Sequence, residues 1–205
     1  MPRPSELGTA YRSSVSHLRH CCTRIDTLLA VKRIGVRDCE LIYESAFLNA
    51  VARFEGLLNR LLEEFVCGSS SRTVAHYSLM SARSRDAFRK MLTRGRPYVE
   101  LMPFDKCLDI AKLYLNQGRP FSDIDAADKH ILAQVVLIRN AIAHRSDAAL
   151  LRFRSEVSGI SFLPVHRQFP GALLRRPYRV SPVATWNDLY FDTLEKVGAQ
   201  LAAAW

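Results

Sequence analysis

Apolar residues recur along most of the chain at three- and four-residue steps, the spacing of one face of an α-helix. The clearest run predicts a long core helix over residues 38–66. Its apolar positions are Ile42, Phe47, Val51, Phe54, Leu58, Leu61 and Phe65. A helix that mixes arginines with apolar residues is predicted before it, over residues 5–31, and Gly35 ends that helix.

Breaking and capping residues divide the next part of the chain into shorter helices. We predict a polar loop at 68–71, a basic helix over 80–93, and helices over 105–115 and 125–144, with a further turn through 157. The breaks fall at Gly95, Pro97, Pro103, Gly118 and Pro120. Ser122, Asp123 and Asp125 can cap the helix over 125–144, and Ser146 or Asp147 the turn after it.

The pattern changes to alternation between residues 158 and 182, where prolines and glycines are frequent. This pattern predicts a small hairpin or an irregular arm. The last helix is predicted from about Thr185 to Trp205. The fold class is therefore all-α, an antiparallel helical bundle with a small irregular or β-hairpin insertion near 158–182. A chain of 205 residues fits a single domain, 1–205.

Composition adds a strong basic charge to this picture. Hydrophobic residues make up 48% and charged ones 24%, as in ordinary globular proteins, but the net charge is +9. Arginine supplies most of it, with 23 arginines against 6 lysines. The planar guanidinium binds phosphate oxygens bidentately, so RNA is a natural partner. A basic surface that serves only solubility is the alternative.

The sequence gives little indication of a signal peptide, a membrane-spanning segment or disulfide bonds. There is no apolar run long enough to cross a membrane, and Met-Pro-Arg-Pro-Ser-Glu lacks the apolar core of a signal peptide, so we expect a cytoplasmic protein with no membrane contact. The cysteines are odd in number and lack Cys-x2-Cys pairing, so we expect reduced core residues. They are Cys21, Cys22, Cys39, Cys67 and Cys107.

The helix predicted over 125–144 has two apolar faces. Ile131, Val135, Ile138 and Ile142 share one sector and should face the core. The opposite face carries Ala133, Val136 and Leu137 beside Asn140 and His144, which stack one turn apart. A fully buried central helix would explain this pattern, and so would a helix buried against a second subunit. The polar pair favours a homodimer, with Ala141 and Ala143 permitting close approach.

Arg139, Asn140 and His144 together fit cleavage of a ribose-phosphate backbone. A histidine exchanges protons near neutral pH, an arginine stabilises charge on the scissile phosphate, and an amide can orient either one. The spacing alone is weak, because Arg12 and His17 repeat it. Context separates the two, since Arg139 follows strong helix packers and precedes an amide. We therefore predict catalysis by Arg139, Asn140 and His144 without metal or cofactor.

The segment Arg139-Asn140-Ala-Ile-Ala-His144 resembles the signature of the HEPN superfamily, an arginine and a histidine a few residues apart with a polar residue after the arginine. The long earlier helix is similar to the core helix of the RiboL-PSP and related bacterial HEPN groups, so the likeness covers residues 38–157. It implies a helical homodimer with its site at the interface and endoribonuclease activity in toxin–antitoxin or antiphage defence, with an antitoxin or other defence protein as partner. Inactive and RNA-binding members imply the alternative, a noncatalytic helical module.

Several further residues are open to two interpretations. The stretch from Gln134 to Ile138 lacks the charged residue that some relatives have, and Glu55 could orient Arg139 or lie on the surface. Arg145 could contact phosphate or only favour the helix dipole. Arg175 and Arg176 in the arm could extend an RNA-binding surface or be merely solvated.

Two rival sites are weaker. His17 and Cys21 lie one turn apart and could be two zinc ligands, but two more are needed, and His76, Cys39 or Cys67 would have to supply them. Residues 94–97, Arg-Gly-Arg-Pro, match the core of an AT-hook, but their apolar flanks favour a helix stop. We predict no metal site.

Overall fold

A computed structural model describes residues 3–68, 77–79, 84–93, 99–161, 164 and 168–204. The chain divides into two compact units. Unit 1 comprises residues 1–11, 53–129 and 195–205, and unit 2 comprises residues 12–52 and 130–194. Each unit is built from several separate stretches of sequence. The single domain expected from chain length stays a prediction.

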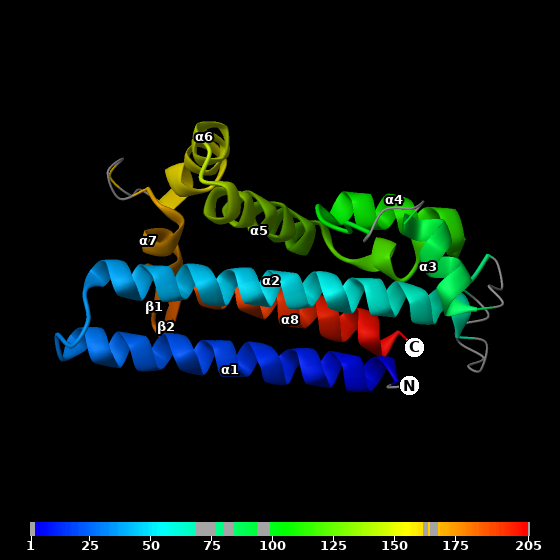
Figure 1. Ribbon diagram of the computed structural model, residues 1–205, viewed down its shortest axis with the longest axis horizontal. Coiled ribbons are helices and arrows are strands. Elements are labelled where there is room, and N and C mark those ends of the chain that lie inside the picture. The colour runs from blue at the N-terminus through cyan, green and yellow to red at the C-terminus, as the bar shows by residue number, and fades with distance from the viewer. Residues whose placement is uncertain are drawn as a thin grey trace. The chain divides into compact units, whose positions relative to one another are not determined.

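The described residues form a mostly helical structure with one small antiparallel hairpin (Figure 1), which confirms the predicted fold class at that level. The helices are α1 (Pro4–Ala30), α2 (Val36–Cys67), α3 (Arg85–Thr93), α4 (Phe104–Tyr114), α5 (Ala126–His144), α6 (Asp147–Glu156), α7 (Pro170–Arg175) and α8 (Trp186–Ala203). Short 3-10 turns are η2 (Asn116–Gly118), η3 (Phe121–Asp123) and η4 (Ser158–Ser161). None of the described helices combines the length and apolar character that a bilayer crossing requires.

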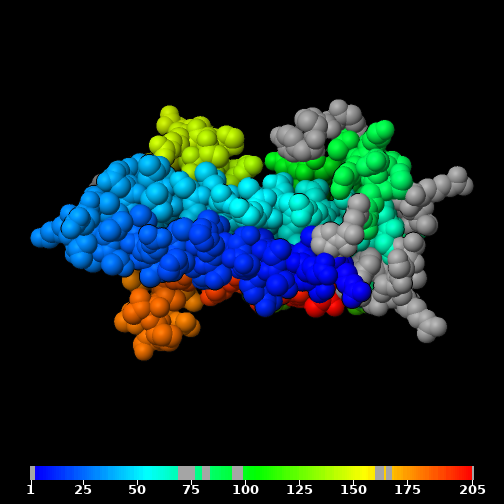
Figure 2. All heavy atoms as spheres, turned by 60° about the horizontal axis from the view of Figure 1, so that its bottom comes forward, coloured from blue at the N-terminus to red at the C-terminus, as the bar shows by residue number. Residues whose placement is uncertain are grey.

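The arm predicted at 158–182 differs in detail from what the sequence suggested. Residues 158–161, at the start of the alternating segment, form the 3-10 turn η4 rather than a strand, and α7 follows at Pro170–Arg175. Proline stops a helix from within but suits its first position, so Pro170 begins α7 rather than breaking it. The hairpin comes later, with β1 at Pro177–Val180 paired to β2 at Val183–Thr185. Figure 2 shows it, in orange, standing out from the surface.

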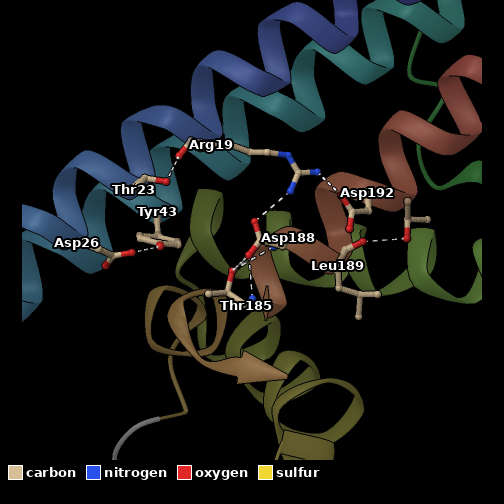
Figure 3. Close-up of polar contacts among 9 residues, drawn as sticks. Arg19, Thr23, Asp26, Tyr43, Thr185, Asp188, Leu189 and Asp192 are labelled. Carbon is tan, nitrogen blue, oxygen red and sulfur yellow. Dashed lines mark hydrogen bonds and ion pairs between the residues drawn. The ribbon is translucent and has the colours of Figure 1, made fainter. Parts of the chain in front are cut away.

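Helix α8 begins at a reciprocal cap directly after the hairpin. The Asp188 amide donates to Thr185 Oγ1 at 3.2 Å, while the Thr185 amide donates to Asp188 Oδ2 at 2.8 Å. This is the capping-box arrangement, with aspartate as the returning acceptor (Figure 3). The last helix therefore starts where the Thr-x-x-Asp spacing allows two amides to be satisfied.

Arg19 joins helix α1 to helix α8 within unit 2. Its guanidinium lies 3.0 Å from Asp188 Oδ1 and 2.6 Å from Asp192 Oδ1 (Figure 3). The centroid of the Phe191 ring lies 5.4 Å from the guanidinium carbon. The side chain is 25% exposed, so these contacts are partly shielded from water. One arginine thus fixes the register of two helices that are more than a hundred residues apart in sequence.

A second polar cluster, around Asp26, ties α1 to α2 and α7. The Tyr43 hydroxyl donates to Asp26 Oδ2 at 2.5 Å (Figure 3), and Cys39 Sγ lies 3.4 Å from Asp26 Oδ1. Arg175 Nε lies 3.5 Å from the same carboxylate. Burial and the neighbouring Asp26 raise the pKa of Tyr43 above its usual value and that of Cys22 to about 12. The described cysteines are free thiols, and the prediction of core positions holds for Cys22, Cys39 and Cys107, whereas Cys21 and Cys67 are half-buried.

Unit 1 uses the second half of α2 as a platform for α3. Two glutamates on this helix are nearly buried, and each meets an arginine of α3. Arg89 Nη2 lies 2.7 Å from Glu63 Oε2, and Arg85 Nη2 lies 2.7 Å from Glu64 Oε2. Edge-on aromatic contacts, Phe65 with Phe121 and Phe88 with Tyr114, complete the packing. The pairing lets charged residues lie beside a hydrophobic core.

Candidate active site

Helix α5 buries the stripe that the sequence assigned to the core. Val135 and Ile138 are fully buried and Ile142 is nearly so, whereas Ile131 is half-buried. Leu132 and Ala141 extend the buried surface. The prediction of one core-facing side is confirmed, and Ala141 belongs to it.

The opposite face of α5 is open to solvent. Ala133 and Ala143 are exposed, and Val136 and Leu137 are only half-buried. A fully buried central helix, one of the two interpretations of its sequence, is therefore wrong. Burial of this face against a second subunit, the other interpretation, stays a prediction.

Arg139 and Asn140, near the end of α5, are hydrogen-bonded to each other. Arg139 Nη1 donates to Asn140 Oδ1 at 2.9 Å, and both side chains are half-buried. The bond occupies one of the five N–H donors of the guanidinium. This bond can orient the arginine, one of the two groups that the sequence left open as a partner of the amide.

His144 is the last residue of α5 and is exposed. Within the described part of the chain, no residue hydrogen-bonds its imidazole. It lies one turn from Asn140 on the same side of the helix. An exposed imidazole without a fixed partner is accessible to a bound substrate.

The chain turns sharply directly after His144. Arg145 has φ +48°, a left-handed conformation that residues with a Cβ adopt rarely, and α6 begins two residues later. Ser146 caps α6, accepting from the Ala149 amide at 3.3 Å, so the serine rather than Asp147 is the cap. The histidine therefore stands at a corner between two helices.

Arg145 is held from the other side by Glu44 of α2. Arg145 Nη2 lies 3.1 Å from Glu44 Oε2, and Glu44 Oε1 accepts from the Gly171 amide at 3.1 Å. Glu44 was not singled out from the sequence. A glutamate three residues before the core Phe47 was a usable signal, because a charge on an apolar face needs a partner.

The arginines proposed for the RNA surface also have structural partners. Arg175 is ion-paired with Asp26 and is largely buried, at 22% side-chain exposure. The Arg176 carbonyl accepts from the Trp186 amide at 2.9 Å, at the base of the hairpin. Contact of these residues with RNA stays a prediction.

Gln134, the polar residue in the stretch before Arg139, has partners within the protein. It is buried, its Oε1 accepts from the Tyr190 hydroxyl at 3.1 Å, and its amide nitrogen lies 3.2 Å from His130 Nε2. Burial raises the pKa of Tyr190, so the hydroxyl stays a donor. Gln134 therefore anchors α5 to α8.

Glu55 has a different partner from the one considered in the sequence. Its Oε1 accepts from the Leu101 amide at 3.0 Å in unit 1, and it is half-buried rather than on the surface. Arg139 donates to Asn140 instead. The carboxylate of Glu55 thus fixes the segment that leads into α4.

The structure gives little support to the zinc site considered as an alternative. His17 Nε2 lies 3.7 Å from Cys21 Sγ, and no group of three potential metal ligands occurs among the described residues. His76 and residues 94–97 lie outside those residues. No protein-family model, no curated protein and no solved structure gives a significant match to the chain.

Proposed function

We propose that this protein is a metal-independent endoribonuclease of the HEPN type that acts in the cytoplasm. The observation that carries the proposal is the end of α5, where Arg139, hydrogen-bonded to Asn140, stands five residues before an exposed His144. These two groups supply the charge stabilisation and proton transfer that RNA cleavage needs.

The reaction is an internal transesterification. An imidazole takes the proton of the 2′-hydroxyl, and the 2′-oxygen forms a bond to phosphorus. The bond from phosphorus to the 5′-oxygen breaks, and an imidazolium gives that oxygen its proton. Arg139 stabilises the charge that builds on the non-bridging oxygens. The products are a 2′,3′-cyclic phosphate and a 5′-hydroxyl.

A homodimer supplies both proton-transfer groups. Acid and base roles need two histidines, and each chain offers one His144 on this face. Two-fold pairing through the open apolar side of α5 would bring the two copies together. The half-buried Val136 and Leu137 give such a pairing its hydrophobic contact.

The test is cleavage of labelled tRNA and mRNA in EDTA by the wild type and by His144→Ala. We expect the wild type to leave cyclic-phosphate ends and the variant to lose at least about 100-fold in rate. His17→Ala is the matched control, since Arg12 and His17 share the same spacing on α1. Full activity in His144→Ala, with the fold intact by circular dichroism, would exclude the proposal.

The second candidate is a noncatalytic helical module that binds RNA or a protein partner. The exposed apolar face of α5 favours it independently of the histidine. In this case RNA binding weakens steeply with salt, and no product forms. In either case the partner is an antitoxin or another defence protein, and expression without it slows growth only if the nuclease is active.

A further inference from the structure

Glu44 is a charged group buried within unit 2. It is 4% exposed, on the side of α2 that carries Tyr43 and Phe47. A buried carboxylate costs several kcal/mol unless hydrogen bonds and an opposite charge compensate it. Glu44 has both, an amide on one oxygen and a guanidinium on the other.

The approach of α7 to Glu44 is too close for any side chain. A Cβ on Gly171 would lie 2.8 Å from the Glu40 carbonyl oxygen and 3.0 Å from Glu44 Oε1. Glycine at this position lets the Gly171 amide reach the carboxylate. The backbone of α7 therefore holds one oxygen of the carboxylate, and the other oxygen is left to pair with Arg145.

The second oxygen of Glu44 then fixes the residue that follows the candidate base. Arg145 has a left-handed φ of +48°, so it ends α5 directly after His144. Its side chain remains 57% exposed, yet one of its nitrogens is held at 3.1 Å. Whatever fixes Arg145 also fixes the corner from which His144 projects.

We propose that Glu44 is a positioning residue, which acts through Arg145 to hold the end of α5 so that His144 meets the scissile phosphodiester in one orientation. The inference rests on the proposed nuclease function. Arg145 accordingly serves the site through its pairing with Glu44 and not as a phosphate ligand. Misplacement of a catalytic group by about 1 Å can cost on the order of 100-fold in rate.

Glu44→Gln tests this with little change of shape. The amide oxygen can still accept from Gly171, but the ion pair with Arg145 is lost. We expect kcat to fall roughly 10-fold or more and KM to stay within about twofold, because Glu44 does not touch RNA. Arg145→Gln should match it, and the double variant should lose no more than either single one. Glu156→Gln, which removes the exposed ion pair with Arg152 on α6, is the control.

The imidazole signals of His144 in NMR spectra provide a readout that does not depend on cleavage. We expect them to shift in Glu44→Gln and to stay unchanged in Glu156→Gln. Wild-type kcat in Glu44→Gln, or unchanged His144 signals, would overturn the inference while His144→Ala still tests the nuclease. A raised KM in Arg145→Gln without a fall in kcat would make Arg145 a phosphate ligand and also overturn it. A wild type that cleaves no RNA would remove the proposed function itself.

Discussion

At the scale of single residues, the sequence identified groups by chemistry but not by partner. Arg139, Asn140 and His144 were singled out because polar side chains interrupt an apolar helix, and Asn140 does orient Arg139. The role of Glu44 could not be predicted, because its partners, Arg145 and Gly171, lie about a hundred or more residues away in sequence. Pairing across that separation depends on tertiary packing, which residue spacing along one helix does not encode.

Substitution of Asn140 should separate orientation from charge. Asn140→Asp keeps a hydrogen-bond acceptor for Arg139, but its negative charge offsets the positive charge of the guanidinium. We therefore expect RNA affinity to fall about 10-fold. Asn140→Ala frees the guanidinium and should mainly lower kcat. Separate measurement of KM and kcat checks both effects. Equal changes in the two variants would contradict an orienting role for the amide.

The buried thiol of Cys22 should make the protein sensitive to alkaline pH. Burial and the nearby Asp26 raise its pKa from 9.0 to about 12, so the unfolded chain ionises first as pH rises. Its contribution to stability is complete below pH 9 and declines between pH 9 and 12. The slope is up to about 1.4 kcal/mol per pH unit. Urea unfolding at pH 8 and 10.5 should show a smaller decline for Cys22→Ala than for the wild type.

At the scale of elements, helix limits followed the sequence closely, whereas the arm did not. The helix predicted over 125–144 spans Ala126–His144, because apolar spacing and caps act locally. Pro170 and Gly171 belong to the proline- and glycine-rich stretch that predicted a hairpin or an irregular arm, yet they begin α7 and allow it to approach α2. Proline can end a helix or begin one, and glycine can break an element or permit close packing. Which role applies depends on the neighbouring element.

Arg19 should stabilise the attachment of α8 more than an ordinary surface arginine does. Arg19→Met removes two ion pairs and the contact with Phe191. We expect the free energy of unfolding to fall by about 1–2 kcal/mol. Arg152→Met, which removes one exposed pair with Glu156, should change it by less than about 0.5 kcal/mol. Equal losses in urea denaturation would mean that Arg19 contributes no more than its exposed counterpart.

At the scale of the whole molecule, charge and symmetry become the relevant quantities. The net charge of +9 could be predicted to favour RNA from composition alone, and the affinity should fall with rising salt. A division into two units built from interleaved stretches could not be predicted, since it depends on which distant segments pack together. The open face of α5 is the surface through which a second subunit would pair with the first.

Mixing subunits tests the composite site. If one RNA bond needs two His144 side chains, a dimer with one His144→Ala subunit is inactive. An equal mixture of exchanging wild-type and variant chains should then keep roughly half the activity per wild-type chain, because random pairing leaves about a quarter of the dimers intact. Unchanged activity per wild-type chain, with exchange verified by mass spectrometry, would show that each chain works alone.

The hairpin offers a practical handle for such measurements. All four residues of β1 are exposed, and Val180 at its end is 82% exposed. Exposed loop tips tolerate insertions better than packed segments do. A fluorophore or short peptide tag at Ser181 would therefore report on subunit exchange while leaving the residues of α5 unmodified.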